Sequence, residues 1–142
     1  MSEDIDWGGM NNPVIEKFRE GTAADAYEFY GQPILLLTTT GAKSGKKRIN
    51  PLVSQFDDGR LYIIASKGGS PDHPDWYYNV EANPDVTVEL PDETFEATAV
   101  EVEDPAERDR IYGLVAGQFT NFVEYEQKTD RRIPVVELVR KS

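Results

Sequence analysis

The strongest constraint on the fold is a series of three strand-like segments joined by short connections. Residues 34–39 are a continuous apolar run that ends in threonines, which is typical of a strand buried on both faces. A second strand is expected from Arg48 to Phe56, where Pro51 predicts a bulge or a sheet edge. The Asp58-Gly59 pair predicts a tight hairpin turn into a third strand over residues 61–66.

The remaining segments alternate between helical and extended patterns. We expect helical segments over residues 13–20, 74–83 and 105–118, a second turn over residues 23–30, and strands over residues 86–90, 94–102 and 133–139. This order, with its short hairpins, predicts an antiparallel barrel covered by helices. By its length, the chain of 142 residues is expected to form one domain, with residues 1–12 as a loose N-terminal arm.

Composition excludes several classes of function. The chain has no cysteine, so disulfides, thiolate metal sites and a cysteine nucleophile are excluded, and one histidine (His73) disfavours an all-protein metal centre. A net charge of -11 argues against nucleic acid as a partner. No apolar run is long enough for an integral membrane segment, so we expect a cytoplasmic protein, with peripheral contact at a membrane surface as an alternative.

Positive charge is concentrated in one region of this acidic chain. Residues 38–71 carry six cations against two anions, so the remainder of a chain with net charge -11 carries -15. Four of those cations lie in a glycine-containing segment, residues 41–48, which we call the basic loop. Glycines let backbone N–H groups approach a ligand closely. We therefore expect a small-molecule ligand that carries phosphate or carboxylate.

The basic loop differs from a nucleotide-binding P-loop. Its glycine-lysine spacing is one residue short, Lys47 stands where serine or threonine is required, and a strand follows instead of a helix. A solvated charged hairpin is the plain alternative. However, pairing of the second and third strands would bring Arg48 near Ser66 and Lys67, so that two basic turns hold one anion between them.

Other candidate residues have structural alternatives. Trp76 is more typical of core than of a ligand platform, whereas Asn79 is suited to donate a hydrogen bond to a ring carbonyl. The aromatic residues Phe119, Phe122 and Tyr125 are spaced by three and so share one helical face. That face would either pack on the barrel or line the site of a flat substrate. No carboxylates pair as acid and base, and we expect His73 on the surface. Demanding chemistry would therefore come from a bound cofactor.

Several motifs together resemble those of a known family. They are residues 36–45 with Arg48 and Asn50-Pro51-Leu52, residues 65–69, residues 74–79, residues 82–84, residues 129–131 and residues 133–135. In this order and spacing they resemble the deazaflavin (coenzyme F420)-dependent nitroreductase and quinone reductase family. The resemblance covers the chain from about Pro33 to Val139.

The resemblance implies a six-stranded antiparallel split β-barrel of the flavin-reductase (FMN-binding) type that binds coenzyme F420. That 8-hydroxy-5-deazaflavin has a phosphodiester and an oligoglutamate tail, which suits the basic loop. By resemblance, the phosphate and tail would be held by Lys43, Ser44, Gly45, Lys46 and Arg48. The deazaflavin would be bounded by Pro51, Ser66, Lys67, Gly68, Gly69, Trp76 and Asn79.

The resemblance further implies transfer of a hydride from the reduced cofactor to a quinone, an enone or a nitroaromatic compound. Phe119, Phe122 and Tyr125 would line the acceptor site. Nitroreducing members carry tyrosines at the first two of these positions, and phenylalanine cannot donate a hydrogen bond to a nitro group. The sequence therefore favours a quinone or an enone as the small-molecule acceptor.

Two other functions remain open from the sequence alone. One is a non-catalytic module that binds a cofactor or an apolar ligand on the same barrel, which the missing tyrosine hydroxyls would suit. The other is a reductase that uses FMN or FAD, since related barrels bind flavins. A homodimer is an open alternative to a monomer, because related barrels often dimerise.

Overall fold

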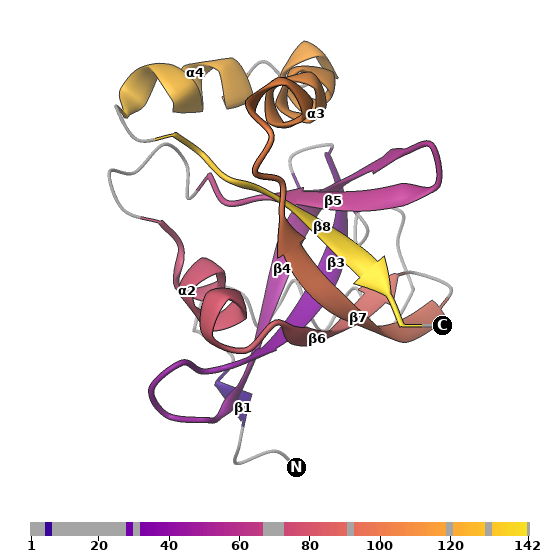
Figure 1. The fold of residues 1–142 in the computed structure, drawn as a ribbon, viewed down its shortest axis with the longest axis vertical. Coiled ribbons are helices and arrows are strands. Elements are labelled where there is room, and N and C mark those ends of the chain that lie inside the picture. The colour runs from indigo at the N-terminus through magenta and orange to yellow at the C-terminus, as the bar shows by residue number, and fades with distance from the viewer. Residues whose placement is uncertain are drawn as a thin grey trace.

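Six antiparallel strands close into a barrel in the computed structural model of the protein (Figure 1). The structure describes residues 5–6, 28–29, 32–66, 73–90, 93–118, 121–129 and 132–141. The barrel strands are β3 (Gln32–Thr40), β4 (Lys47–Asp57), β5 (Arg60–Ile64), β6 (Asp85–Leu90), β7 (Glu93–Glu101) and β8 (Val135–Arg140). The described helices are α2 (Asp75–Ala82), α3 (Pro105–Gln118) and α4 (Asn121–Lys128). The predicted barrel and helical cover are confirmed.

Strand pairing follows the order β4-β5-β8-β7-β6-β3, and a further pairing of β3 with β4 closes the ring. Two short strands extend it: β1 (Ile5–Asp6) lies parallel to β4, and β2 (Glu28–Phe29) lies antiparallel to β3. The expected turn over residues 23–30 is therefore wrong at Glu28–Phe29, because the chain there is extended and pairs with β3. The other residues of that segment, and the expected helix over residues 13–20, lie outside the described residues.

The long strand β4 closes the barrel because its two halves have different partners. Residues 47–53 pair with β3, whereas residues 54–57 pair with β5. Pro51 lies opposite Leu36 of β3, and among the described residues no strand pairs with it on its other side. The predicted sheet edge at Pro51 is thus confirmed, and a proline is accommodated there because its missing N–H interrupts no ladder on that side.

The turn between β4 and β5 has the predicted conformation. Asp58 has a φ of 52° and Gly59 a φ of 79°, and Asp57 pairs with Arg60 across the turn. Positive φ at both central residues is what a two-residue hairpin with the right-handed strand twist requires. Asp-Gly is a sequence that meets this requirement at little cost.

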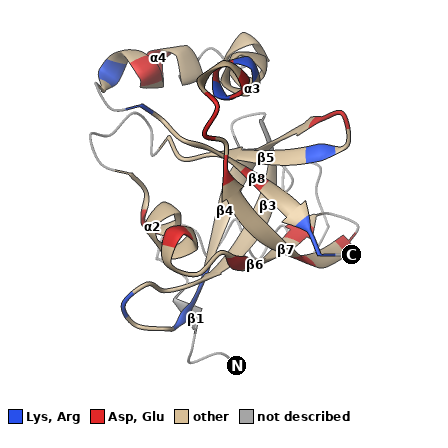
Figure 2. Ribbon diagram, viewed as in Figure 1, with Lys and Arg blue, Asp and Glu red and all other residues tan. Residues whose placement is uncertain are grey.

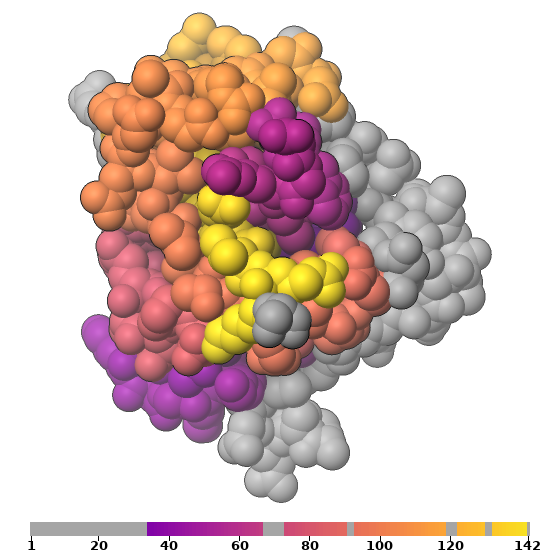
Figure 3. Space-filling view, turned by 45° about the vertical axis from the view of Figure 1, so that its right-hand side comes forward, coloured from indigo at the N-terminus to yellow at the C-terminus, as the bar shows by residue number. Residues whose placement is uncertain are grey.

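Two apolar clusters hold the molecule together. The first fills the barrel and receives Trp76, Tyr77 and Val80 from α2, and the second lies beneath α3 and α4. Leu35, Leu36 and Leu37 of β3 have no exposed surface, which confirms the strand buried on both faces. In the space-filling view of Figure 3, α3 and α4 lie at the end opposite the basic loop and α2, which adjoin each other.

Arg108 joins α3 to α4 and to the segment before β8. Its side chain is buried, with Nε donating to the Ile133 carbonyl (2.9 Å) and Nη1 donating to carboxylates of Asp109 (3.0 Å) and Glu126 (3.1 Å). Its guanidinium group also lies 4.5 Å from the ring centroid of Tyr112. These contacts fix the helical layer on the barrel.

Among the described helices, none is long and apolar enough to span a membrane.

Candidate functional site

The basic loop is held in a compact turn by its own backbone. Gly41 N–H donates to the Lys46 carbonyl (2.7 Å), and Gly45 N–H donates to the Gly41 carbonyl (3.0 Å). Lys46 N–H donates to Ser44 Oγ (3.1 Å). Gly45 has a φ of 73°, a conformation that other residues adopt only at a cost. The two bounding strands pair up to Thr40 and Lys47, so the loop is a short, closed hairpin.

Gly41 is required by the close approach of the loop to itself. A Cβ atom at this position would lie 2.6 Å from Ser44 Oγ and 3.2 Å from the Lys46 carbonyl oxygen. A side chain would therefore displace the serine hydroxyl and strain the backbone. The glycine at 41 thus serves the shape of the loop, while Gly45 serves its backbone conformation.

Asn79 of α2 anchors the loop from outside. Its Oδ1 accepts a hydrogen bond from Ala42 N–H (3.0 Å), and its Nδ2 donates to Thr39 Oγ1 (3.3 Å). Asn79 and Thr39 are both buried, so the bond between them is shielded from water, whereas the bond to the exposed Ala42 is partly buried. One amide side chain thereby ties the loop, the end of β3 and α2 together.

Two adjacent backbone donors of the loop remain for a ligand. Ala42 N–H is engaged by Asn79, and those of Gly41, Gly45 and Lys46 are engaged within the loop. Among the described residues, the N–H groups of Lys43 and Ser44 have no partner. Successive N–H groups in a turn are a recurrent anion-binding feature.

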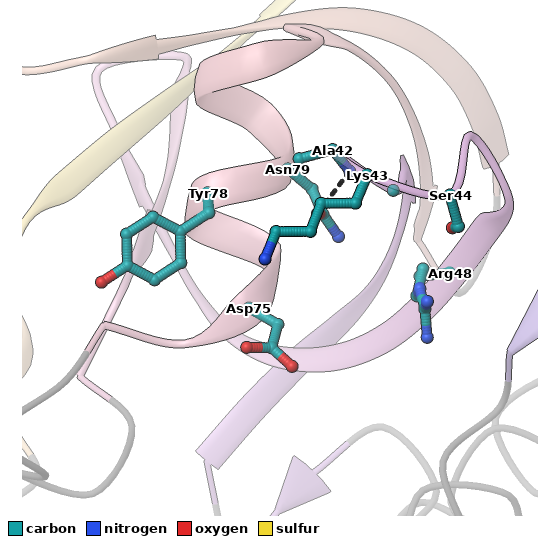
Figure 4. A pocket seen from close by; sticks show the side chains of 8 residues that line it. Ala42, Lys43, Ser44, Arg48, Asp75, Tyr78 and Asn79 are labelled. Atoms are coloured by element: carbon teal, nitrogen blue, oxygen red, sulfur yellow. Dashed lines mark hydrogen bonds between the residues drawn. The ribbon is translucent and has the colours of Figure 1, made fainter.

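A cavity of about 530 Å³ lies between the basic loop and α2 (Figure 4). One wall is the loop with the start of β4, and the other is the first turns of α2. It is lined by Gly41, Ala42, Lys43, Ser44, Arg48, Asp75, Tyr78 and Asn79. Its volume falls in the usual range for small-molecule sites, roughly 300–1,000 Å³.

The cations of the loop differ from most others in the protein. Arg60, Arg108, Arg110, Arg132, Arg140 and Lys141 all form ion pairs with carboxylates. Within the described ranges, Lys43, Lys46 and Lys47 form none, although they are exposed and close in sequence. Figure 2 shows this basic segment at the lower edge of the barrel. An external anion would meet lysine side chains that form no ion pair with any described carboxylate.

Several predicted cofactor-binding residues lie apart from the cavity lining. Gly45 and Lys46 are exposed on the loop, whereas Pro51 and Ser66 are half-buried on β4 and just after β5. The β4–β5 ladder ends at Ser54 and Ile63, so strand pairing does not place Arg48 beside Ser66. The pairing that the sequence analysis expected there is absent, because β4 leaves β5 to pair with β3, and the joint binding of an anion by the two turns stays a prediction. Residues 67–69 lie outside the described residues.

The predicted aromatic positions are mostly internal. Trp76 is 4% exposed within the barrel core, which favours its structural alternative. Phe122 is 3% exposed beneath α3, and half-buried Tyr125 packs against it with ring centroids 5.1 Å apart. Phe119 lies outside the described residues. A role for these side chains in binding a cofactor or an acceptor stays a prediction.

Asp75 and Tyr78 line the cavity although the sequence did not single them out. Together with Asn79 they occupy positions i, i+3 and i+4 of α2 and therefore share one helical face. The Tyr78 ring packs edge-on against the rings of His73 (5.7 Å between centroids) and Tyr77 (5.8 Å). His73 is half-buried against these rings rather than on the open surface.

We expect the Asn79→Ala variant to loosen the basic loop. It leaves the buried Thr39 Oγ1 and the partly buried Ala42 N–H without this partner, at a cost of about 1–3 kcal/mol. Urea unfolding should show this loss, and exchange of the Ala42 amide hydrogen, followed by NMR, should accelerate. Asn79→Asp keeps the acceptor and should restore the protection of Ala42. Unchanged exchange in the alanine variant would show that Asn79 does not hold the loop.

The barrel and the position of this cavity define a class. A closed six-stranded antiparallel barrel with helical cover is the split barrel of the flavin-reductase type, here with a cavity at its rim that basic residues line in part. Residues 13–140 match the family described as F420H2-dependent quinone reductase, and the chain belongs to that family. The family resemblance stated from the motifs is confirmed.

Individual relatives agree with this assignment. An F420H2-dependent quinone reductase of Mycobacterium tuberculosis is 42% identical over 115 residues, which cover 77% of this chain and 74% of that protein. A solved F420H2-dependent reductase (FDR-A) is 48% identical, with a TM-score of 0.67, and covers 75% of this chain and 93% of that one. A structure described as a domain-swapped dimer is 41% identical, with a TM-score of 0.69, over 92% of this chain and 97% of that one.

Family membership confirms the predicted class of function. The protein is an oxidoreductase that uses coenzyme F420. The sequence left three functions open. The family is described as F420H2-dependent quinone reductase, so membership favours the F420-dependent reductase over a flavin-dependent reductase and a non-catalytic binding module.

Proposed function

We propose that the protein transfers a hydride from reduced coenzyme F420 to a quinone or an enone, and that the basic loop binds the anionic part of the cofactor. The observation that carries the proposal is the cavity between the loop and α2. It combines two backbone N–H groups without partners among the described residues and a lysine, Lys43, without an ion pair among them. A phosphodiester with a carboxylate tail is complementary to this combination.

The residues present fit such a cofactor. Lys43 and Ser44 offer adjacent N–H groups, Arg48 adds a guanidinium group to the same wall, and Asn79 holds the loop in position. Lys46 and Lys47 lie beyond the cavity lining, where a flexible anionic tail would extend. When bound, the deazaflavin supplies the hydride. The described protein groups bind and orient its anionic part.

The preference for a quinone or an enone over a nitro compound rests on the acceptor side chains. Phe119 and Phe122 have no hydroxyl groups, and Phe122 is packed in the core beneath α3. A nitro group would find no hydrogen-bond donor in these two side chains. Quinones and enones accept a hydride at carbon or oxygen and can take their proton from water.

The direct test is turnover with purified protein and reduced coenzyme F420. We expect menadione, as the quinone, and cyclohexenone, as the enone, to reoxidise the cofactor in a protein-dependent way, followed by the absorbance of oxidised deazaflavin. A nitroimidazole should be reduced much more slowly. If neither the quinone nor the enone is reduced although the cofactor binds, the proposed acceptor class is wrong.

We further propose that the protein acts in the cytoplasm as a homodimer. The relative described as a domain-swapped dimer supports self-association, since its likeness spans 92% of this chain. The acidic composition supports the absence of a nucleic acid partner. Light scattering at micromolar concentration, compared with the mass of 16.0 kDa for one chain, would test the dimer.

A further inference from the structure

Side chains of α2 bond the rest of the protein from two sides of the helix. On one side, Asn79 bonds the backbone of the basic loop and Thr39 of β3. On the other, the Tyr77 hydroxyl donates to Glu101 Oε1 at the end of β7 (2.5 Å). This second bond joins residues that are 24 positions apart in the sequence, and the proposed function does not use it.

The two attachments act from nearly opposite sides of α2. Tyr77 and Asn79 are two positions apart, which places them about 200° from each other around the helix axis. The apolar contacts of Trp76 and Val80 hold α2 on the barrel, but apolar attraction has no preferred direction. Hydrogen bonds have a preferred distance and angle. The two bonds together therefore determine how α2 is rotated about its axis.

The rotation of α2 sets the shape of the cavity. Asp75 and Tyr78 extend from α2 toward the same space as Lys43 of the basic loop (Figure 4). The Tyr78 ring also packs on that of Tyr77, so the two rings move together. α2 has only eight residues and begins without a side-chain cap, and helices this short are marginal by themselves. Its position therefore depends on contacts with other elements.

The bond between Tyr77 and Glu101 suits this role. Burial and the bond to Glu101 raise the pKa of the Tyr77 hydroxyl, so the hydroxyl stays protonated and remains a donor. A charged acceptor makes the bond stronger than one between neutral groups. Glu101 is exposed, so water can hydrate its carboxylate when the hydroxyl is removed. The Tyr77→Phe variant is thus expected to keep the fold.

We propose that Tyr77 and Glu101 are positioning residues, which hold the α2 wall at the distance from the basic loop that the bound cofactor requires. Neither is among the described residues that line the cavity, so they act through the helix and not by contact with the ligand. The inference rests on the proposed binding of the cofactor's anionic part in this cavity. The pair should therefore affect the affinity for the cofactor and not the rate of hydride transfer once the cofactor is bound.

Titration and single-turnover kinetics of the intact protein test this separation. Tyr77→Phe should raise the dissociation constant of coenzyme F420 about three- to tenfold, as the loss of one hydrogen bond allows. The rate of hydride transfer to menadione from saturating reduced cofactor should change by less than about twofold. A reduced rate at saturation with unchanged affinity would overturn the proposal.

Variants of Glu101 test whether the two residues act through one bond. Glu101→Ala should weaken cofactor binding as much as Tyr77→Phe, and the double variant should bind no more weakly than either single one. Glu101→Gln keeps an oxygen acceptor and should restore the affinity to within about twofold of the original protein. Additive losses in the double variant would contradict the proposal.

Tyr112→Phe is the matched control. It also removes a tyrosine hydroxyl with a hydrogen bond, here to the Phe122 carbonyl (2.7 Å) between α3 and α4. The change destabilises the protein away from α2, so the affinity for the cofactor should change by less than about twofold. Equal weakening in the two phenylalanine variants would mean that general destabilisation is the cause, and the proposal would fail.

Amide hydrogen exchange tests the position of α2 without the cofactor. Ala42 N–H donates to Asn79, so its exchange rate reports whether α2 keeps its place against the loop. Tyr77→Phe should accelerate this exchange about three- to tenfold, and an unchanged rate would overturn the proposal. Faster exchange with unchanged cofactor affinity in both Tyr77→Phe and Lys43→Glu would instead show that the cofactor binds elsewhere, so that the proposed function fails. Unchanged affinity in Tyr77→Phe alone would refute the role of the pair.

Discussion

Replacing Lys43 with glutamate is expected to weaken the binding of coenzyme F420 by about 10- to 100-fold. The change removes one charge-assisted hydrogen bond, worth about 1.5–3 kcal/mol, where each 1.4 kcal/mol is a factor of ten in the dissociation constant. It also places a second carboxylate opposite Asp75 in the cavity. Lys43 is exposed and forms no ion pair within the described ranges, so the fold should be unaffected. Fluorescence titration with the cofactor would measure the change.

Lys128→Glu is the matched control for this charge reversal. Lys128 is exposed at the end of α4, and the described structure shows no ion pair for it either. The two variants have the same net charge, so a general electrostatic effect would appear in both. We expect Lys128→Glu to change the dissociation constant by less than about threefold. Equal losses in the two variants would mean that the overall charge, rather than the loop, governs binding.

The second large effect is expected on stability, from the Arg108→Ala variant. The buried guanidinium group donates to the Ile133 carbonyl and to Glu126 of α4, and it covers the ring of Tyr112. Its removal leaves a carbonyl without a donor and opens a space in the second apolar cluster. We expect a loss of about 2–4 kcal/mol in the free energy of unfolding, measured with urea. Lysine should not restore it, because it lacks the planar group that reaches several partners.

Arg132→Ala provides the comparison for this loss. Arg132 also bonds Asp109 (2.8 Å), but both side chains are more than half exposed. Exposed ion pairs contribute roughly 0–1 kcal/mol, so this variant should be nearly as stable as the original protein. If the two variants were equally stable, Arg108 would not be what holds α3 and α4 on the barrel.

The barrel could be predicted largely because its signals are local. The apolar run of β3 and the Asp58-Gly59 turn each determine their own conformation through burial and backbone preference. The path of β4 is different. Its change of partner near Ser54 depends on closure of the whole barrel, which no short segment encodes. The short strand at Glu28–Phe29 is likewise set by a neighbour, β3, and not by its own pattern.

The loop wall of the site could also be predicted, because its charge and its glycines are visible in the sequence. The α2 wall could not, since the sequence does not say which face of this helix meets the loop. Trp76 and Tyr77 mark the buried face, and Asp75, Tyr78 and Asn79 follow on the face turned to the cavity. Asn79 illustrates the difference, because its bond to the backbone of the loop could not be read from the sequence, whereas its predicted bond to a ring carbonyl stays a prediction.

The most direct test of the central claim is a titration of the protein with coenzyme F420, FMN and FAD in low and high salt, followed by tryptophan fluorescence. Binding through the cations of the basic loop predicts a clear preference for F420 and a marked loss of affinity as salt increases. Equal affinity for the three cofactors, or binding of F420 that salt does not weaken, would contradict the assignment of the basic loop as its anion-binding site.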